Sequence, residues 1–140
     1  MEGAESMTPF PLTIISPDGP KFEGQAEELI VRTTSGDLGI LAGHTNCVAP
    51  LGMGRATVII DGKKRHGACI GGILSMADGK ATLVTTTFEW AEDIDAQRAE
   101  DSYQRAKQVL DSKDASDTEI ALAQARLRRA LVRKSVAGNK

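Results

Sequence analysis

Arginine side chains recur at helical spacing in two segments near the C-terminal end of the sequence. In one segment Arg126, Arg129 and Arg133 are separated by three and four residues, so a helix would place them on one face. In the other, the same spacing joins an acid, two arginines and a hydroxyl: Asp95, Arg98, Ser102 and Arg105. Arginine presents a fork of donors to phosphate oxygens. If the two helices pack as a hairpin, a triphosphate site could form from Arg98, Arg105, Arg129 and Arg133.

Asp95 has two interpretations in this arrangement. As a ligand, its carboxylate could accept a hydrogen bond from an adenine amino group or a ribose hydroxyl. As a structural residue, an Asp at a helix start is favoured by the helix dipole, caps the backbone, and forms a surface ion pair with Arg98 worth under about 1 kcal/mol. The sequence leaves both open.

The charge of the chain is unevenly distributed. The formal net charge is -2, but residues 91–119 carry four basic and nine acidic side chains, and residues 120–140 carry six basic and no acidic ones. The basic segment could be a solvated face, could complement the acidic segment within a hairpin, or could bind an acidic surface elsewhere. Nucleic acid is not expected as a partner, since aromatic residues make up only 4%.

No catalytic or metal-binding motif is visible. The sequence contains no GxxxxGK phosphate loop, no GxSxG turn and no HExxH pair. His44, His66, Cys47 and Cys69 are too dispersed to form a metal site, and the cysteines are expected to be reduced packing residues. We therefore expect a protein that is not an enzyme and requires no metal or cofactor; a small hydrolase with an unrecognised site is the enzyme alternative.

Residues 8–88 have the pattern of an antiparallel β-sandwich. Short runs rich in Val, Ile and Thr, such as 12–15 and 56–60, alternate with turn residues. Asp-Gly pairs at 18–19, 61–62 and 78–79 predict type I′ hairpin turns. Eight to ten strands would fit this length.

Residues 89–140 have the pattern of an antiparallel two-helix hairpin. Helical periodicity covers 92–111 and 117–136, and Ser116 with Glu119 forms a capping-box pattern at the second start. The apolar stripes are mostly alanine, which favours helix but buries little area. Such a hairpin could be mobile, or it could be packed permanently on the sandwich.

Composition excludes several other classes. The chain of 140 residues suits one domain, or a small domain with an appendage. No apolar run approaches the roughly 20 residues that span a bilayer. The acidic N-terminal segment, residues 1–6, has the features of neither a secretory signal nor a transit peptide.

An ordered set of motifs resembles the epsilon subunit of bacterial F-type ATP synthases. The segments, in the family's order, are 12–19 (LTIISPDG), 22–24 (FEG), 34–41 (TSGDLGIL), 43–44 (GH), 71–74 (GGIL), 94–99 (IDAQRA) and 129–133 (RALVR). The resemblance implies the same fold, a β-sandwich followed by two helices.

The resemblance also implies a role and its partners. The sandwich would contact the gamma subunit and the membrane rotor ring (the c-ring) through a surface that includes Asp37 and His44. The helices would extend toward the alpha/beta catalytic hexamer and inhibit hydrolysis, with four arginines meeting the beta subunits: Arg126, Arg128, Arg129 and Arg133. The expected location is the cytoplasmic face of the bacterial membrane, as a peripheral part of the complex.

In members that bind ATP, residues 94–99 match the nucleotide motif and Glu89 matches a further ligand position. ATP is therefore expected as a regulatory ligand. The full candidate set is Glu89, Ile94, Asp95, Arg98, Arg105, Arg129 and Arg133. A free-standing ATP-sensing module remains the alternative to a stalk subunit, and the two differ in whether a stable stalk partner exists.

Overall fold

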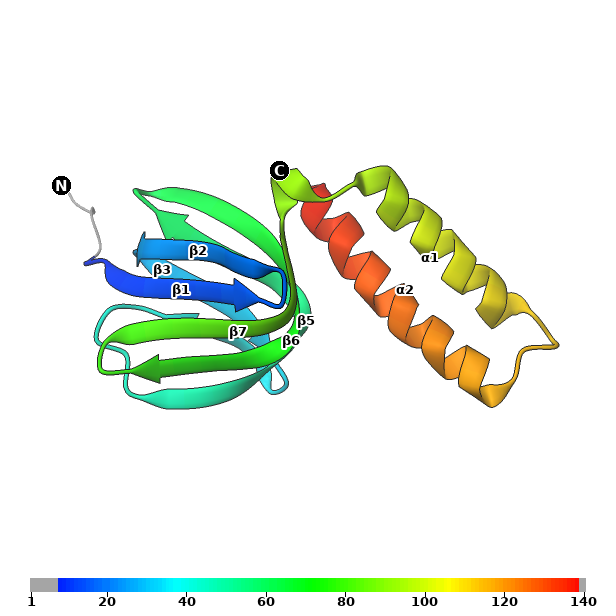
Figure 1. The fold of residues 1–140 in the computed structure, drawn as a ribbon, viewed down its shortest axis with the longest axis horizontal. Coiled ribbons are helices and arrows are strands. Elements are labelled where there is room, and N and C mark those ends of the chain that lie inside the picture. Colours follow the sequence, from blue (N-terminus) through cyan, green and yellow to red (C-terminus); the bar gives the residue numbers. More distant parts are fainter. Residues whose placement is uncertain (1–7, 139–140) are drawn as a thin grey trace.

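The computed structural model describes residues 8–138, and these form seven strands followed by two helices (Figure 1). The predicted architecture, a β-sandwich with a C-terminal helical hairpin, is confirmed. The N-terminal segment 1–6 and the last two positions of the predicted hairpin segment, 139–140, lie outside the described residues.

The strands form one continuous sheet in the order β2-β1-β7-β6-β5-β3-β4. Neighbouring strands are antiparallel except for β1 and β7, which are parallel. The strands are β1 (Phe10–Ser16), β2 (Gly19–Ala26), β3 (Glu28–Thr33), β4 (Gly36–Ile40), β5 (Cys47–Ile60), β6 (Lys63–Ala77) and β7 (Lys80–Trp90).

The prediction of eight to ten strands was wrong for the described chain, which has seven. Several of the glycines among the turn residues lie instead inside two long strands, β5 of 14 residues and β6 of 15. Gly71 and Gly72 have φ angles of 71° and 119° within β6, and the register with β5 and β7 is the same on both sides of them. Glycine here allows a positive-φ backbone inside a strand, where the sequence pattern suggested a turn.

Two of the three predicted Asp-Gly turns have the expected conformation. Asp61 and Gly62, and likewise Asp78 and Gly79, both have positive φ, as a type I′ turn requires. At the first hairpin only Gly19 is in the positive-φ region. The ring of Pro17 fixes a negative φ at the first turn position, so a type I′ turn cannot form there.

The core lies between the two layers that the folded sheet makes. Phe10, Leu12 and Ile14 of β1 share one buried cluster with Leu29 and Val31 of β3, although β1 and β3 lie far apart in the strand order. The cluster is mainly aliphatic, as expected from the composition. It closes near the helices with the edge-to-face aromatic pair Phe88 and Trp90.

The helical segment begins later than the sequence pattern indicated. β7 continues through Glu89 to Trp90, a short 3₁₀ helix covers Ala91–Asp93, and Ile94 is extended. The helices are α1 (Ala96–Asp111) and α2 (Asp117–Ala137). The capping box at Ser116 and Glu119 is confirmed. The acidic residues at 92 and 93, which lie within the predicted helical range 92–111, belong to the 3₁₀ helix.

The two helices pack through the predicted alanine stripes, whose buried members are Ala99, Ala106, Ala123 and Ala130. Leu131 is not part of the stripe, because its side chain is 45% exposed. The hairpin projects from one end of the sandwich, and its connecting turn lies far from the sheet (Figure 1). No helix in residues 8–138 is long and apolar enough to cross a membrane.

Candidate functional site

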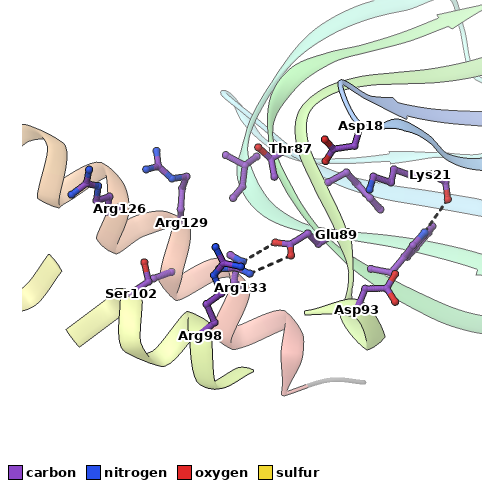
Figure 2. A pocket seen from close by; sticks show the side chains of 14 residues that line it. Asp18, Lys21, Thr87, Glu89, Asp93, Arg98, Ser102, Arg126, Arg129 and Arg133 are labelled. Atoms are coloured by element: carbon purple, nitrogen blue, oxygen red, sulfur yellow. Dashed lines mark hydrogen bonds and ion pairs between the residues drawn. The ribbon is translucent and has the colours of Figure 1, made fainter. Parts of the chain in front are cut away.

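A cavity of about 530 Å³ lies between the hairpin and the adjacent end of the sandwich (Figure 2). The last part of β7 and the first hairpin form one wall, and α1 and α2 form the other. The lining residues that carry polar or charged side chains are Asp18, Lys21, Thr87, Glu89, Trp90, Asp93, Arg98, Ser102, Arg126, Arg129 and Arg133.

Three arginines line this cavity without an ion-pair partner among the described residues. Arg98 comes from α1, and Arg126 and Arg129 come from α2. Within residues 8–138, none of the three guanidinium groups forms an ion pair or a side-chain hydrogen bond. Three unpaired cations around one cavity are suited to an anion with several oxygens, such as a chain of phosphates.

Arg133 already has a partner at the site. Its Nε donates to Oε1 of Glu89 at 2.7 Å, and Nη2 donates to Oε2 at 3.2 Å. Both side chains are mostly buried, 19% exposed for Arg133 and 27% for Glu89. This two-point contact joins β7 to the end of α2 and fixes one wall of the cavity against the other.

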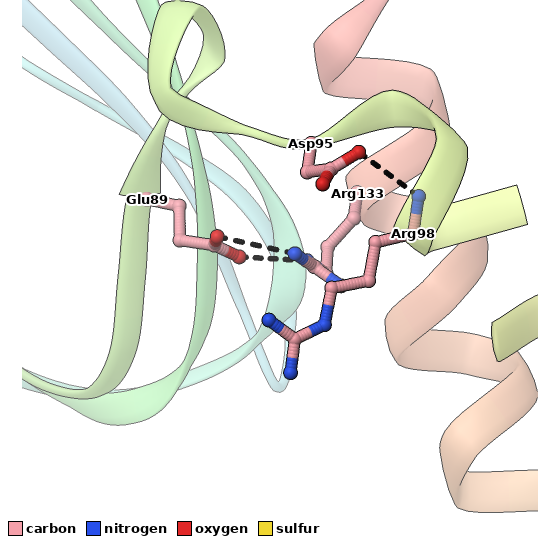
Figure 3. A network of polar contacts seen from close by, with 4 residues as sticks. All are labelled: Glu89, Asp95, Arg98 and Arg133. Atoms are coloured by element: carbon pink, nitrogen blue, oxygen red, sulfur yellow. Dashed lines mark hydrogen bonds and ion pairs between the residues drawn. The ribbon is translucent and has the colours of Figure 1, made fainter. Parts of the chain in front are cut away.

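Asp95 is the N-cap of α1, as its structural interpretation predicted (Figure 3). Its Oδ1 accepts from the backbone N–H of Arg98 at 3.0 Å, while the Arg98 side chain extends toward the cavity. The predicted ion pair between the two side chains does not occur, since the contact is with the backbone. Ile94 is 3% exposed and packs in a small apolar cluster between the 3₁₀ helix, β6 and the end of α2.

Arg105 lies outside this cavity, in contrast to the expectation that four arginines would converge. It lines a second cavity of about 340 Å³ between α1 and α2, near the connecting turn. Ser102 and Arg126 line both cavities, so the two adjoin. Arg105 is about two helical turns beyond Arg98, which moves it about 10 Å along the axis and away from the sandwich.

The sandwich contributes lining residues that the sequence did not indicate. Asp18 and Lys21 come from the first hairpin, and Thr87 from β7. Their approach to the helices depends on strand order and register, for which no local sequence signal exists. The resemblance assigns Arg126 only to a partner contact, but Arg126 also lines the cavity, as its shared helix face with Arg129 and Arg133 would indicate.

The basic segment contributes only one ion pair between the helices within residues 8–138. Lys134 of α2 lies 2.7 Å from Oε1 of Glu100 of α1 and also lies over the Tyr103 ring. Hydrogen bonds from Lys134 and Gln104 lower the pKa of Glu100. Arg128 is exposed and lines neither of the two cavities.

The predicted stalk-contact residues lie on the sandwich, away from the arginines. Asp37 of β4 pairs with Arg32 at 2.9 Å, and both side chains are more than half exposed. His44 follows a turn, and its Nδ1 contacts the Thr45 carbonyl at 2.8 Å. Cys69 is buried, and burial raises its pKa to about 12. No group of three potential metal ligands occurs in the described part of the chain.

Known proteins resemble the chain over both of its parts. Residues 9–91 match the family model for the ATP synthase delta/epsilon chain beta-sandwich domain, and residues 92–138 match that for its long alpha-helix domain. The ATP synthase epsilon chain of Ruminococcus albus is 41% identical over 135 residues, covering 96% of this chain and all of the relative. That of Bacillus velezensis is 41% identical over 128 residues, covering 91% and 96%.

Solved structures share the fold. A chain in the OSCP/F1/c-ring structure of the Euglena gracilis mitochondrial ATP synthase aligns with a TM-score of 0.80 at 22% identity, over 100% of this chain and 91% of that one. A chain in the central stalk/c-ring structure from Tetrahymena thermophila aligns with a TM-score of 0.63 at 10% identity, over 95% and 99%. The two family models and the full-length relatives show that the chain belongs to the family of ATP synthase epsilon chains.

Proposed function

We propose that the chain is the non-catalytic central-stalk subunit of a bacterial F-type ATP synthase, which joins the gamma subunit to the rotor ring and restrains ATP hydrolysis through its hairpin. The observation that carries this proposal is the match to both epsilon-chain domains, in order, over residues 9–138. The assembled complex would hold the chain at the cytoplasmic face of the membrane.

The outer face of the sandwich supports a protein contact in the stalk. Ile15, Val84 and Ile73 are directly paired neighbours on β1, β7 and β6, and their exposures are 39%, 53% and 50%. Paired residues share one face of a sheet, so these side chains form an apolar row in solvent. Such a row suits a protein partner, and we assign the gamma subunit to it. Asp37 and His44 are assigned to contacts with gamma or the rotor ring.

A negatively charged substitution of the apolar row tests the stalk assignment. Ile73→Glu combined with Val84→Glu should prevent the chain from co-purifying with gamma from the same cell, because two carboxylates would enter the contact. Leu122→Glu is the control, since Leu122 is similarly exposed, at 53%, but lies on α2. Retention of gamma by the double variant at the parent level would overturn this assignment.

The arginine-lined cavity supports regulation by ATP. A triphosphate between Arg98 of α1 and Arg126 and Arg129 of α2 would bind only the closed hairpin, and a ligand that binds one state stabilises that state. In the open hairpin Arg126 and Arg129 of α2, together with Arg128 and Arg133, would be available to acidic surfaces of the catalytic beta subunits. ATP and the hexamer would thus compete for the basic face of α2.

Substitutions of two arginines distinguish ATP binding from binding to the hexamer in a hydrolysis assay of the assembled complex. Arg128→Gln should reduce inhibition and lower the ATP concentration that relieves it, because Arg128 lies outside the cavity and its loss weakens only the competing contact with the hexamer. Arg98→Gln should leave inhibition in place and raise that concentration. If the two variants have the same effect, the division between ligand site and partner site is wrong.

A free-standing ATP-sensing module is a second candidate, favoured by a cavity that one chain forms alone. It predicts nucleotide binding with no retained gamma subunit, so the co-purification experiment separates the two functions.

A further inference from the structure

Three residues on neighbouring strands form a row that faces the end of α2. Arg55 of β5 pairs with Ala68 of β6, and Ala68 pairs with Glu89 of β7. Directly paired residues share a face of the sheet. The row therefore has a cation at one end, a small apolar residue in the middle and a carboxylate at the other end.

Residues in the last two turns of α2 contact each of the three members of this row. Arg133 makes the two-point contact with Glu89, at 2.7 and 3.2 Å. Nη2 of Arg55 donates to Oγ of Ser135 at 3.0 Å and to its carbonyl oxygen at 3.4 Å. Ala68 is 1% exposed and belongs to one buried cluster with Val136 and Ala137 of α2, Ala91 and Ile94.

Docking of the hairpin is concentrated at this end. α2 makes the main helical contacts with β5 and β6, and the connecting turn projects away from the sheet (Figure 1). The interface between the helices is formed mainly by alanines, which bury little area. The contacts of the row are therefore the principal attachment of the hairpin to the sandwich.

Arg55 has an additional electrostatic reason to attract the helix end. The last carbonyl groups of a helix carry partial negative charge, and a cation beside them is favourable. Ser135 lies in the last turn of α2, so the guanidinium of Arg55 is placed at the negative end of the helix dipole. Arg55 thus supplies from the sandwich the charge that a capping residue would supply locally.

We propose that the row of Arg55, Ala68 and Glu89 is a latch that holds the hairpin against the sandwich without any ligand. The latch rests on the proposed mobility of the hairpin, but it requires neither nucleotide nor a partner subunit. Glu89 and Arg133 form one polar contact of the latch, Arg55 and Ser135 form the other, and the apolar cluster lies between them. Opening the hairpin requires both contacts to separate.

Hydrogen exchange of the full chain, without nucleotide, tests the latch. Arg55→Gln and Glu89→Gln should each accelerate exchange of the amides in residues 130–137 about three- to tenfold, as expected for loss of the net contribution of a typical hydrogen bond. The double variant should multiply the two effects. Strands β1 and β3 should keep their protection. Arg32→Gln is the control, because Arg32 is an exposed arginine whose ion-pair partner, Asp37, lies on β4 and not on α2.

A substitution on the helix side and a fluorescence measurement distinguish loss of the latch from distortion of the sheet. Ala137→Glu changes only the helix side of the latch, where Ala137 is 8% exposed, and should accelerate the same amides. Trp90 is 4% exposed, lines the cavity and is the single tryptophan of the sequence, so acrylamide should quench its fluorescence more strongly in all three latch variants.

Unchanged exchange in residues 130–137 of Arg55→Gln and Ala137→Glu, or equal acceleration in Arg32→Gln, would overturn the latch. The result is independent of the proposed function. A working latch in a chain that binds neither ATP nor gamma would refute the proposed function alone, and absence of the latch would leave ATP binding and gamma binding to their own tests.

Discussion

At the residue scale, the candidate site is a cavity lined by arginines from both helices. Arg98, Arg129 and Arg133 were predicted to converge, and all three line one cavity. The acid of the motif, Asp95, contacts the backbone of Arg98 instead of lining that cavity. Asp95 is exposed and lies in the chain between two residues that do line the cavity, Asp93 and Arg98, so we propose that a bound nucleotide extends beyond the cavity to the second carboxylate oxygen of Asp95.

Asp95→Asn separates capping from ligand binding. Asn caps helices about as well as Asp, so helix content and thermal unfolding should change little, whereas Asp95→Ala should cost about 1 kcal/mol of stability. Both variants should weaken ATP binding about three- to tenfold, because each removes the second carboxylate oxygen as an acceptor. Circular dichroism and calorimetry on the same samples measure the two effects. Parent-like ATP affinity in Asp95→Asn would leave Asp95 only the capping role.

At the element scale, the helical hairpin combines weak apolar packing with specific polar contacts. Alanine stripes form the interface, and Lys134 with Glu100 supplies an ion pair across it. Glu119 caps its own helix by accepting from the backbone N–H of Ser116, and this contact lowers its pKa. The polar contacts of the hairpin therefore depend on ionised carboxylates.

Acid should loosen the hairpin. The pKa values of Glu100 and Glu119 both lie below the ordinary 4.5 in the folded state. Their contribution to stability is thus complete above the unfolded-state value and is lost as the pH falls through the folded values. Helix content measured between pH 6 and pH 3 should fall in this range, and Glu100→Gln with Glu119→Gln should flatten the profile. A double variant with the parent profile would contradict the assignment.

Prediction from sequence succeeded where the signal is local and failed where it depends on register. The capping box at Ser116, the turns at Asp61 and Asp78, and the alanine stripes each follow from residues a few positions apart. The row that contains Arg55 and Glu89 joins three strands and a helix end. No short segment of the sequence indicates that these residues are paired across strands, so the docking surface can be recognised only in the folded structure.

At the scale of the whole molecule, the two parts form one candidate site at their junction. The sandwich supplies Glu89 and the first-hairpin residues, and the hairpin supplies three arginines that lack an acidic partner among residues 8–138. A closed hairpin is required for Arg98 and Arg129 to approach each other, since they lie on different helices. We therefore expect ligand binding and hairpin closure to be coupled.

Calorimetric titration of the full chain with ATP, and with ADP for comparison, tests this coupling most directly. We predict saturable binding at one site, tighter for ATP, and weakened about tenfold or more in Arg129→Gln, which removes a charged donor from the cavity. Arg128→Gln is the matched control on the adjacent, exposed position, and should bind like the parent. Absence of binding heat up to millimolar ATP, or equal losses in the two variants, would contradict an ATP site between the helices and the sandwich.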